Sequence, residues 1–226
     1  MDNKKIDKKI LKIKKKIDCF ISDSDYLEDD IHKIRICARE ILSLLKDKNL
    51  NCIEIKKILK LSNKIRDIDV LLNQYLVNIP KKHQIQINLS MLNNILTKKR
   101  DDDMKILLNY LKQFLVENIV LLKLNKTNFS ISKPELSSNI KQLHKYRIYI
   151  KNLLYITKNE TSKDKFKIKL LTKIKNLLGD INDNYNAIKI IKKISSNKIN
   201  LDGLINYTNK KNNSSFNKAK KLILTL

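Results

Sequence analysis

Two stretches of the chain carry the residue types best suited to chemistry. They read "IHKIRICAREI" from Ile31 and "LHKYRIYIKNL" from Leu143, and each places a histidine first, an arginine three residues later and a further cation four residues after that. The six positions are His32, Arg35, Arg39, His144, Arg147 and Lys151. At about 100° per residue, positions i, i+3 and i+7 of a helix lie within roughly 60° of one another. Each stretch therefore predicts a helix with one cationic face, and we call these faces the first and the second stripe.

The chemistry that these side chains share is the recognition of anions. Arginine presents a planar fork of donors that matches phosphate oxygens, and lysine adds a mobile point charge. Histidine, with a reference pKa of about 6.5, donates from one ring nitrogen when neutral and from both when charged. A basic face on a single helix is more often plain solvated surface. The chain has only five arginines, however, and three of them stand in the stripes. This repetition in register favours a surface that binds a polyanion.

A second motif follows each stripe in the same order. It reads "LSNKIRDIDVLL" (61–72) after the first stripe and "LLGDINDNYNAI" (177–188) after the second. The matched pairs include Asp67 with Asp183 and Arg66 with Asn182. Two unrelated helical segments would rarely agree in both motif and order, so the sequence predicts an internal duplication.

The aspartates of this motif are expected to hold the cations of the stripes in place through charge-assisted hydrogen bonds. The residues that we expect to support the stripes are Arg66, Asp67, Tyr155 and Asp183. A metal site on Asp67 and Asp69 is an alternative, and it is weakened because no further Asp, Glu or His stands at ligand spacing. Gly179 is one of only two glycines and lies inside a helical pattern, which predicts close helix packing or a mild kink.

The elements that position these residues are helices. Two glycines and two prolines in 226 residues supply little material for the tight turns of a β-rich fold, so the expected fold class is all-α. Apolar periodicity predicts helices over 3–21, 25–47, 52–78, 82–100, 102–123, 135–158, 162–194, 201–210 and 214–224. On the helix of the first stripe, the face opposite the cations is apolar and is expected to be buried. Its residues are Ile34, Cys37, Ala38, Ile41 and Leu45.

The polar segment 125–134 divides the chain into two helical halves, 1–124 and 135–226, and each half carries one stripe. We interpret both halves as parts of a single domain, 1–226. The net charge of +25 implies an anionic partner, although abundant lysine also gives a solvated surface. The three cysteines show no C-x-x-C spacing and indicate neither disulfides nor zinc. Since no secretion signal and no long apolar run occurs, we expect a cytoplasmic protein without membrane contact.

The two copies of His-x-x-Arg-x-x-x-(Arg/Lys), each with its following motif, resemble the conserved histidine α-helical domain (CHAD) family over nearly the whole chain. The resemblance implies two pseudo-twofold-related helical bundles with a basic central channel or groove, in which the six stripe residues line the site. It also implies binding of inorganic polyphosphate by a stand-alone module, as a scaffold or in association with polyphosphate granules. Members of the family tend to continue the stripe with further arginines, where this chain has Glu40, Leu42, Asn152 and Leu154.

Two other functions fit the charge. One is binding of the RNA backbone, which is disfavoured because the chain has no tryptophan, few aromatics beside its cations and no recognisable nucleic-acid-binding signature. The other is a metal-dependent phosphohydrolase that uses His32 or His144 with one of the motif aspartates. Because the chain lacks a nucleophile motif and a phosphate-cradling glycine loop, we expect no enzyme, no catalytic residue, no metal and no cofactor.

Overall fold

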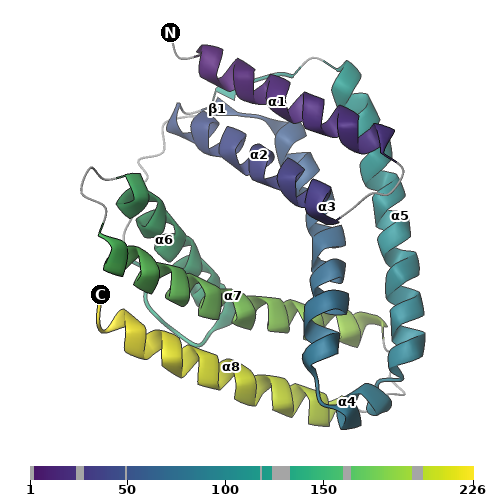
Figure 1. Cartoon of the computed structure of the whole chain (residues 1–226), viewed down its shortest axis with the longest axis vertical. Coiled ribbons are helices and arrows are strands. Elements are labelled where there is room, and N and C mark those ends of the chain that lie inside the picture. The colour runs from purple at the N-terminus through teal and green to yellow at the C-terminus, as the bar shows by residue number, and fades with distance from the viewer. Residues whose placement is uncertain are drawn as a thin grey trace. The chain divides into compact units, whose positions relative to one another are not determined.

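The computed structural model describes residues 3–23, 28–48, 50–117, 119–123, 133–159, 164–194 and 201–226. These residues are predominantly helical, so the all-α fold class is confirmed (Figure 1). The α-helices are α1 (Asn3–Ser22), α2 (Glu28–Asp47), α3 (Ile53–Val70), α4 (Lys81–Gln86), α5 (Leu89–Val116), α6 (Ile140–Asn159), α7 (Lys165–Ile194) and α8 (Asp202–Ile223). A short antiparallel pair joins β1 (Leu50–Asn51) to β2 (Leu122–Lys123), with Leu50 opposite Lys123.

Several predicted helix boundaries were wrong. The segment 52–78 is α-helical only to Val70 and continues as a π-helical turn, η1 (Leu71–Tyr75), and a 3-10 turn, η2 (Leu76–Asn78). The break predicted near 101 does not exist, because "RDDD" contains no glycine or proline and α5 runs through it. The break predicted at 211–213 is absent for the same reason, and buried residues before and after it anchor α8 as one helix.

The described residues cluster into two compact units. Unit 1 consists of Met1–Gln74 and Asn93–Asn128. Within it α1 packs along α2, and α2 packs against α3 (Figure 1). The apolar face predicted for the first stripe helix is buried in the core of this unit, together with side chains from α1, α3 and α5. The prediction for Ile34, Cys37, Ala38, Ile41 and Leu45 is therefore confirmed.

Unit 2 consists of Tyr75–Leu92 and Phe129–Leu226, and in it α7 packs against both α6 and α8. The sequence division at the linker places 75–92 in the first half, whereas the compact units place these residues in the second. Contacts with α8 explain the difference. The Tyr75 hydroxyl lies 2.6 Å from the Thr208 hydroxyl, which donates to the Leu204 carbonyl at 2.8 Å and so accepts from Tyr75. Most of the linker lies outside the described residues.

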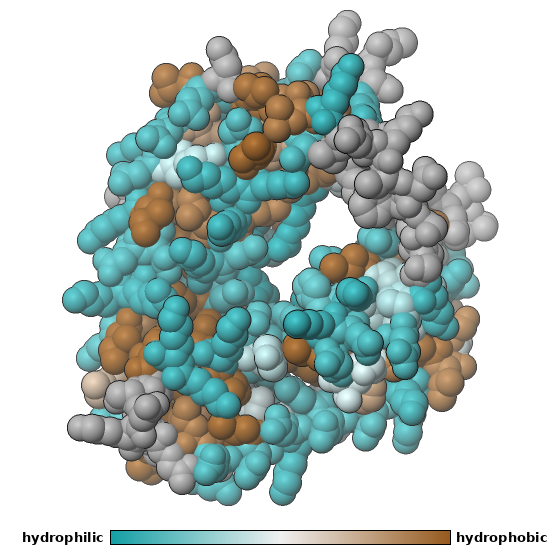
Figure 2. Space-filling view, turned by 180° about the vertical axis from the view of Figure 1, so that it is seen from behind, coloured by the Kyte–Doolittle hydropathy of each residue, from teal (hydrophilic) through white to brown (hydrophobic). Residues whose placement is uncertain are grey.

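The hydrophilic surface of the molecule agrees with the high proportion of charged residues in the sequence. Figure 2 shows one face of the molecule on which hydrophilic side chains predominate and hydrophobic ones form separate patches. Among the described residues, every helix is too short or too polar to cross a membrane.

Candidate functional site

The first stripe is split between solvent and interior. His32 and Arg39 are exposed on α2, whereas Arg35 is buried with 3% of its surface accessible. The guanidinium of Arg35 reaches α3, where its Nη2 donates to Asn63 Oδ1 at 2.7 Å and its Nη1 lies 3.4 Å from the Ser62 carbonyl oxygen. Helical geometry places the three cations within one sector, and Arg35 occupies the edge of that sector that faces the neighbouring helix. This contact fixes the arginine between the two helices of the repeat.

A cleft of about 240 Å³ opens beside this arginine in unit 1. It is lined by residues of α2, α3 and η1: Glu28, Asp29, Ile31, His32, Arg35, Arg66, Asp69, Val70 and Gln74. The cleft therefore brings together three of the cationic residues that the sequence indicates. It also contains three carboxylates, so the charge around it is mixed rather than purely basic.

Asp69 is the buried carboxylate of this cleft. It follows Ser62 and Ile65 at helical spacing, and all three are buried. Burial raises the pKa of the Asp69 carboxyl above its ordinary value, while the hydrogen bond from Arg100 opposes this shift. The sequence pointed instead to Asp67, which lies beside Arg66 with 3.8 Å between Nη1 and Oδ1.

Arg100 is a residue of this cluster that the sequence reasoning missed. Its Nε donates to Asp69 Oδ1 at 2.6 Å, across from α5 to α3. The rarity of arginine in the sequence could have identified this residue, because Arg100 is the one arginine of the chain that lies outside the repeated motifs. An arginine that is rare in a lysine-rich chain is a candidate for a buried ion pair, since its planar fork is suited to carboxylates.

The second stripe shows the same division. His144 and Lys151 are exposed on α6, and Arg147 is partly buried. The guanidinium of Arg147 lies over Gly179 of α7, where an added Cβ would be 3.4 Å from Nη2 and 3.7 Å from Cζ. Of the two alternatives predicted for Gly179, packing against the neighbouring helix is the one observed, and the packed group is the stripe arginine itself.

The two arginines contact the same position of the repeat. With Asp67 matched to Asp183, Asn63 matches Gly179. Arg35 bonds to Asn63 in unit 1, and Arg147 packs on Gly179 in unit 2. The core positions also match: buried Ile31, Ile34 and Ala38 correspond to buried Leu143, Tyr146 and Ile150. Each unit therefore uses one helix pair in which an arginine is held at an equivalent place.

Carboxylates also lie near the second stripe. Partial desolvation and the charge of Asp183 raise the pKa of the Asp180 carboxyl, while the charges of Lys211 and Arg147 lower it. Asp183 accepts a long hydrogen bond of 3.4 Å from the Asn182 amide. The side chain of Tyr155 lies outside the described residues.

In the described part of the chain, no group of three or more His, Cys, Asp or Glu side chains is placed so that it could hold a metal ion.

Comparison of the chain with models of known protein families, with curated proteins and with solved structures gave no match.

Proposed function

We propose that this protein is a CHAD-like module that binds inorganic polyphosphate through its two stripes, without enzymatic activity. The observation that carries the proposal is the equivalent placement of Arg35 and Arg147 within the two units. In each unit the following helix holds one arginine, and a histidine and a second cation stand exposed on the same stripe helix. Because the arginine holds the stripe helix against its neighbour, the exposed histidine and second cation stand on a fixed helix face, and a pre-organised face loses less conformational entropy when an anion arrives.

Polyphosphate fits this arrangement better than RNA does. A polyanion without bases needs only charge and donors, whereas single-stranded RNA gains much of its affinity from stacking on aromatic rings. Two tyrosines of α6, Tyr146 and Tyr149, pack edge to face against each other, and Tyr146 is fully buried. Binding of the RNA backbone is the second candidate function, favoured by the net charge of +25 alone.

The proposed function also requires a particular arrangement of the two helical bundles. We propose a pseudo-twofold arrangement of the two helical bundles, with the stripes facing one basic channel or groove, so that one polyphosphate chain engages both. Cytoplasmic location and association with polyphosphate granules are further parts of the proposal. The duplication in the sequence and the repeated arginine contact support the pseudo-twofold arrangement.

Competition binding tests the ligand. Long-chain polyphosphate, RNA and heparin compete for the labelled protein at physiological salt, and polyphosphate is expected to bind most tightly. A preference for RNA would exchange the first and second candidate functions.

A matched pair of variants tests the site. Lys151→Gln removes one charge from the second stripe, and Lys221→Gln removes one from an exposed position of α8 outside the stripes. Loss of a charge-assisted contact is expected to weaken polyphosphate binding roughly fivefold to tenfold for the first variant, and less than twofold for the second. Equal losses would mean that the chain acts only as a diffuse cation.

A further inference from the structure

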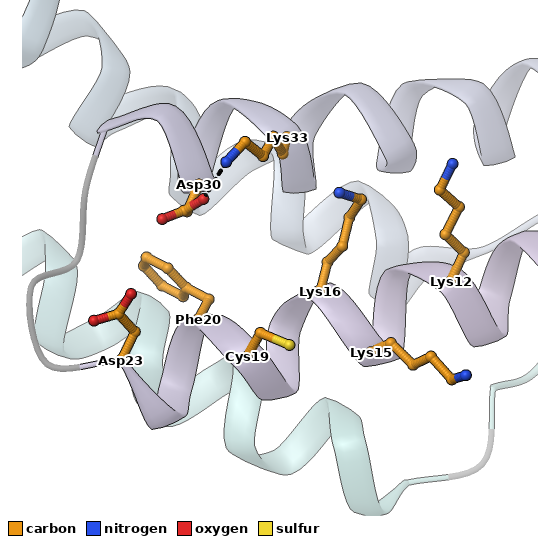
Figure 3. A pocket seen from close by; sticks show the side chains of 8 residues that line it. All are labelled: Lys12, Lys15, Lys16, Cys19, Phe20, Asp23, Asp30 and Lys33. Carbon is orange, nitrogen blue, oxygen red and sulfur yellow. Dashed lines mark hydrogen bonds and ion pairs between the residues drawn. The ribbon is translucent and has the colours of Figure 1, made fainter.

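A second cleft of about 330 Å³ lies between α1 and α2 in unit 1, and none of its residues belongs to a stripe (Figure 3). Its lining consists of Lys12, Lys15, Lys16, Cys19, Phe20, Asp23, Asp30 and Lys33. This volume falls at the lower end of the range of about 300–1,000 Å³ that is typical of small-ligand sites. We call it the lysine cleft.

The charges of the lysine cleft are separated along its length. Figure 3 shows the ammonium groups of Lys12 and Lys16 extending from α1 toward α2, while Asp23 and Asp30 stand at the other end, on either side of the Phe20 ring. Asp30 Oδ1 accepts a hydrogen bond of 2.6 Å from Lys33 Nζ, so that Lys33 is already paired. Lys12 and Lys16 thus form a cationic end, and the two aspartates form an anionic end.

The packing of α1 holds the cationic end in place. Ile13 and Ile17 are fully buried and fix the rotation of the helix about its axis. Lys12 and Lys16 are four residues apart and therefore lie on one face of the helix, where their like charges repel each other. A multivalent anion between them would relieve this repulsion.

We propose that the lysine cleft binds a short chain of condensed phosphate, of about the length of a triphosphate. The two lysines that extend into the cleft, Lys12 and Lys16, supply mobile point charges for a ligand with several close phosphates. The carboxylates at the other end repel phosphate, so the cleft accepts a short chain or a chain end and not the middle of a long chain. This site goes beyond the stripes in both position and ligand length.

Free tripolyphosphate and the tail of a nucleoside triphosphate share this chemistry. Titration of the full chain with tripolyphosphate, ATP and AMP distinguishes them. Binding of tripolyphosphate and ATP with similar affinity indicates that the triphosphate alone is recognised, and binding of tripolyphosphate alone indicates a free condensed phosphate. Absence of tripolyphosphate binding at physiological salt would overturn the proposal.

Variants locate the site. The double substitution Lys12→Gln and Lys16→Gln is expected to weaken tripolyphosphate binding by about tenfold or more, since two charge-assisted contacts are lost. The control, Lys218→Gln with Lys221→Gln, removes the same charge from exposed positions of α8 and should change the affinity less than twofold. Equal effects of the two pairs would refute a site in the lysine cleft.

Labelling of the wild-type protein gives a second measurement that needs no variant. Tripolyphosphate should slow acetylation of Lys12 and Lys16 and leave Lys218 and Lys221 unchanged, as read by mass spectrometry. Equal protection at all four lysines would contradict the proposal. Lys151→Gln separates the two sites, because it should weaken long-chain polyphosphate binding and leave tripolyphosphate binding in place.

Discussion

Alanine at two matched positions of the repeat should have opposite effects on stability. In Asn63→Ala, buried Arg35 loses the acceptor that lies 2.7 Å from its Nη2. Loss of a hydrogen bond to a charged group costs about 1.5–3 kcal/mol, and alanine regains about 0.5 kcal/mol through its higher helix propensity. The free energy of unfolding should therefore fall by about 1–2.5 kcal/mol.

Gly179→Ala should act in the other direction. The new Cβ would lie at ordinary van der Waals distance from the Arg147 guanidinium, 3.4 Å from Nη2, so the arginine keeps its place. Replacing a glycine by alanine inside a helix stabilises by about 0.5–1 kcal/mol. A leucine at this position would place further carbon atoms where the guanidinium lies, and Gly179→Leu should destabilise the protein and displace Arg147.

Urea unfolding, followed by far-UV circular dichroism, measures these differences. For a chain of this size, 1 kcal/mol corresponds to a change of about 2–4 °C in the melting temperature. Asn109→Ala on α5 is the control for Asn63→Ala, because Asn109 is an exposed helical asparagine away from the stripe. Changes of the same sign for Asn63→Ala and Gly179→Ala would refute either the stabilising hydrogen bond at Asn63 or the room for a Cβ at Gly179.

Four other substitutions test separate features of the structure. Arg100→Gln leaves the buried Asp69 carboxylate without its 2.6 Å donor, and should lower the unfolding free energy in urea by about 2–3 kcal/mol; an unchanged midpoint would show that this ion pair does not stabilise the fold. Asp29→Asn removes a carboxylate from the cleft of the first stripe and should tighten polyphosphate binding about twofold to threefold in a competition assay. Lys151→Gln should make the log–log dependence of polyphosphate affinity on salt shallower by about 0.7, by analogy with single-stranded nucleic acids, and an unchanged slope would place Lys151 outside the contact. Burial raises the pKa of Tyr75 from 10.0 to about 12. The folded chain therefore keeps a proton that the unfolded chain releases, and stability should fall as the pH rises through this window, by up to about 1.4 kcal/mol per pH unit. Tyr75→Phe should remove this part of the decline, measured as unfolding free energy against pH.

The fold class and the core face of the first stripe helix could be predicted because both depend on local features, namely apolar periodicity and the scarcity of glycine and proline. The continuity of α5 and α8 could not be read in this way. Polar runs such as "RDDD" and "NNSS" resemble loops by composition, but buried side chains on both sides hold them in helices. Tertiary packing outweighs weak local preference at these places.

At the candidate site, spacing alone predicted which helix face carries the cations. It could not predict that Arg35 turns into the helix interface, because the donor fork of an arginine reaches a partner 28 positions further along the chain. Asp69, and not Asp67, is the buried carboxylate of the cleft because of the rotation of α3 about its own axis, which buried Ile65 fixes. Arg100 comes from α5 and could not be joined to the motif without the fold.

The assignment of Tyr75–Leu92 to unit 2 affects how the chain acquires its structure during synthesis. Unit 1 is interrupted by this segment, and unit 2 begins with it, so neither unit can be completed by a continuous stretch of chain. The segment has buried side chains, namely Tyr75, Leu76 and Ile79. The hydroxyl that bonds to Tyr75 belongs to Thr208, which is synthesised more than 130 residues later. A cut at the linker between the two repeats would follow the duplication, yet it would separate unit 2 from part of its own interior. Separately expressed halves should therefore fold poorly alone and regain structure when mixed, which makes the chain suitable for fragment complementation.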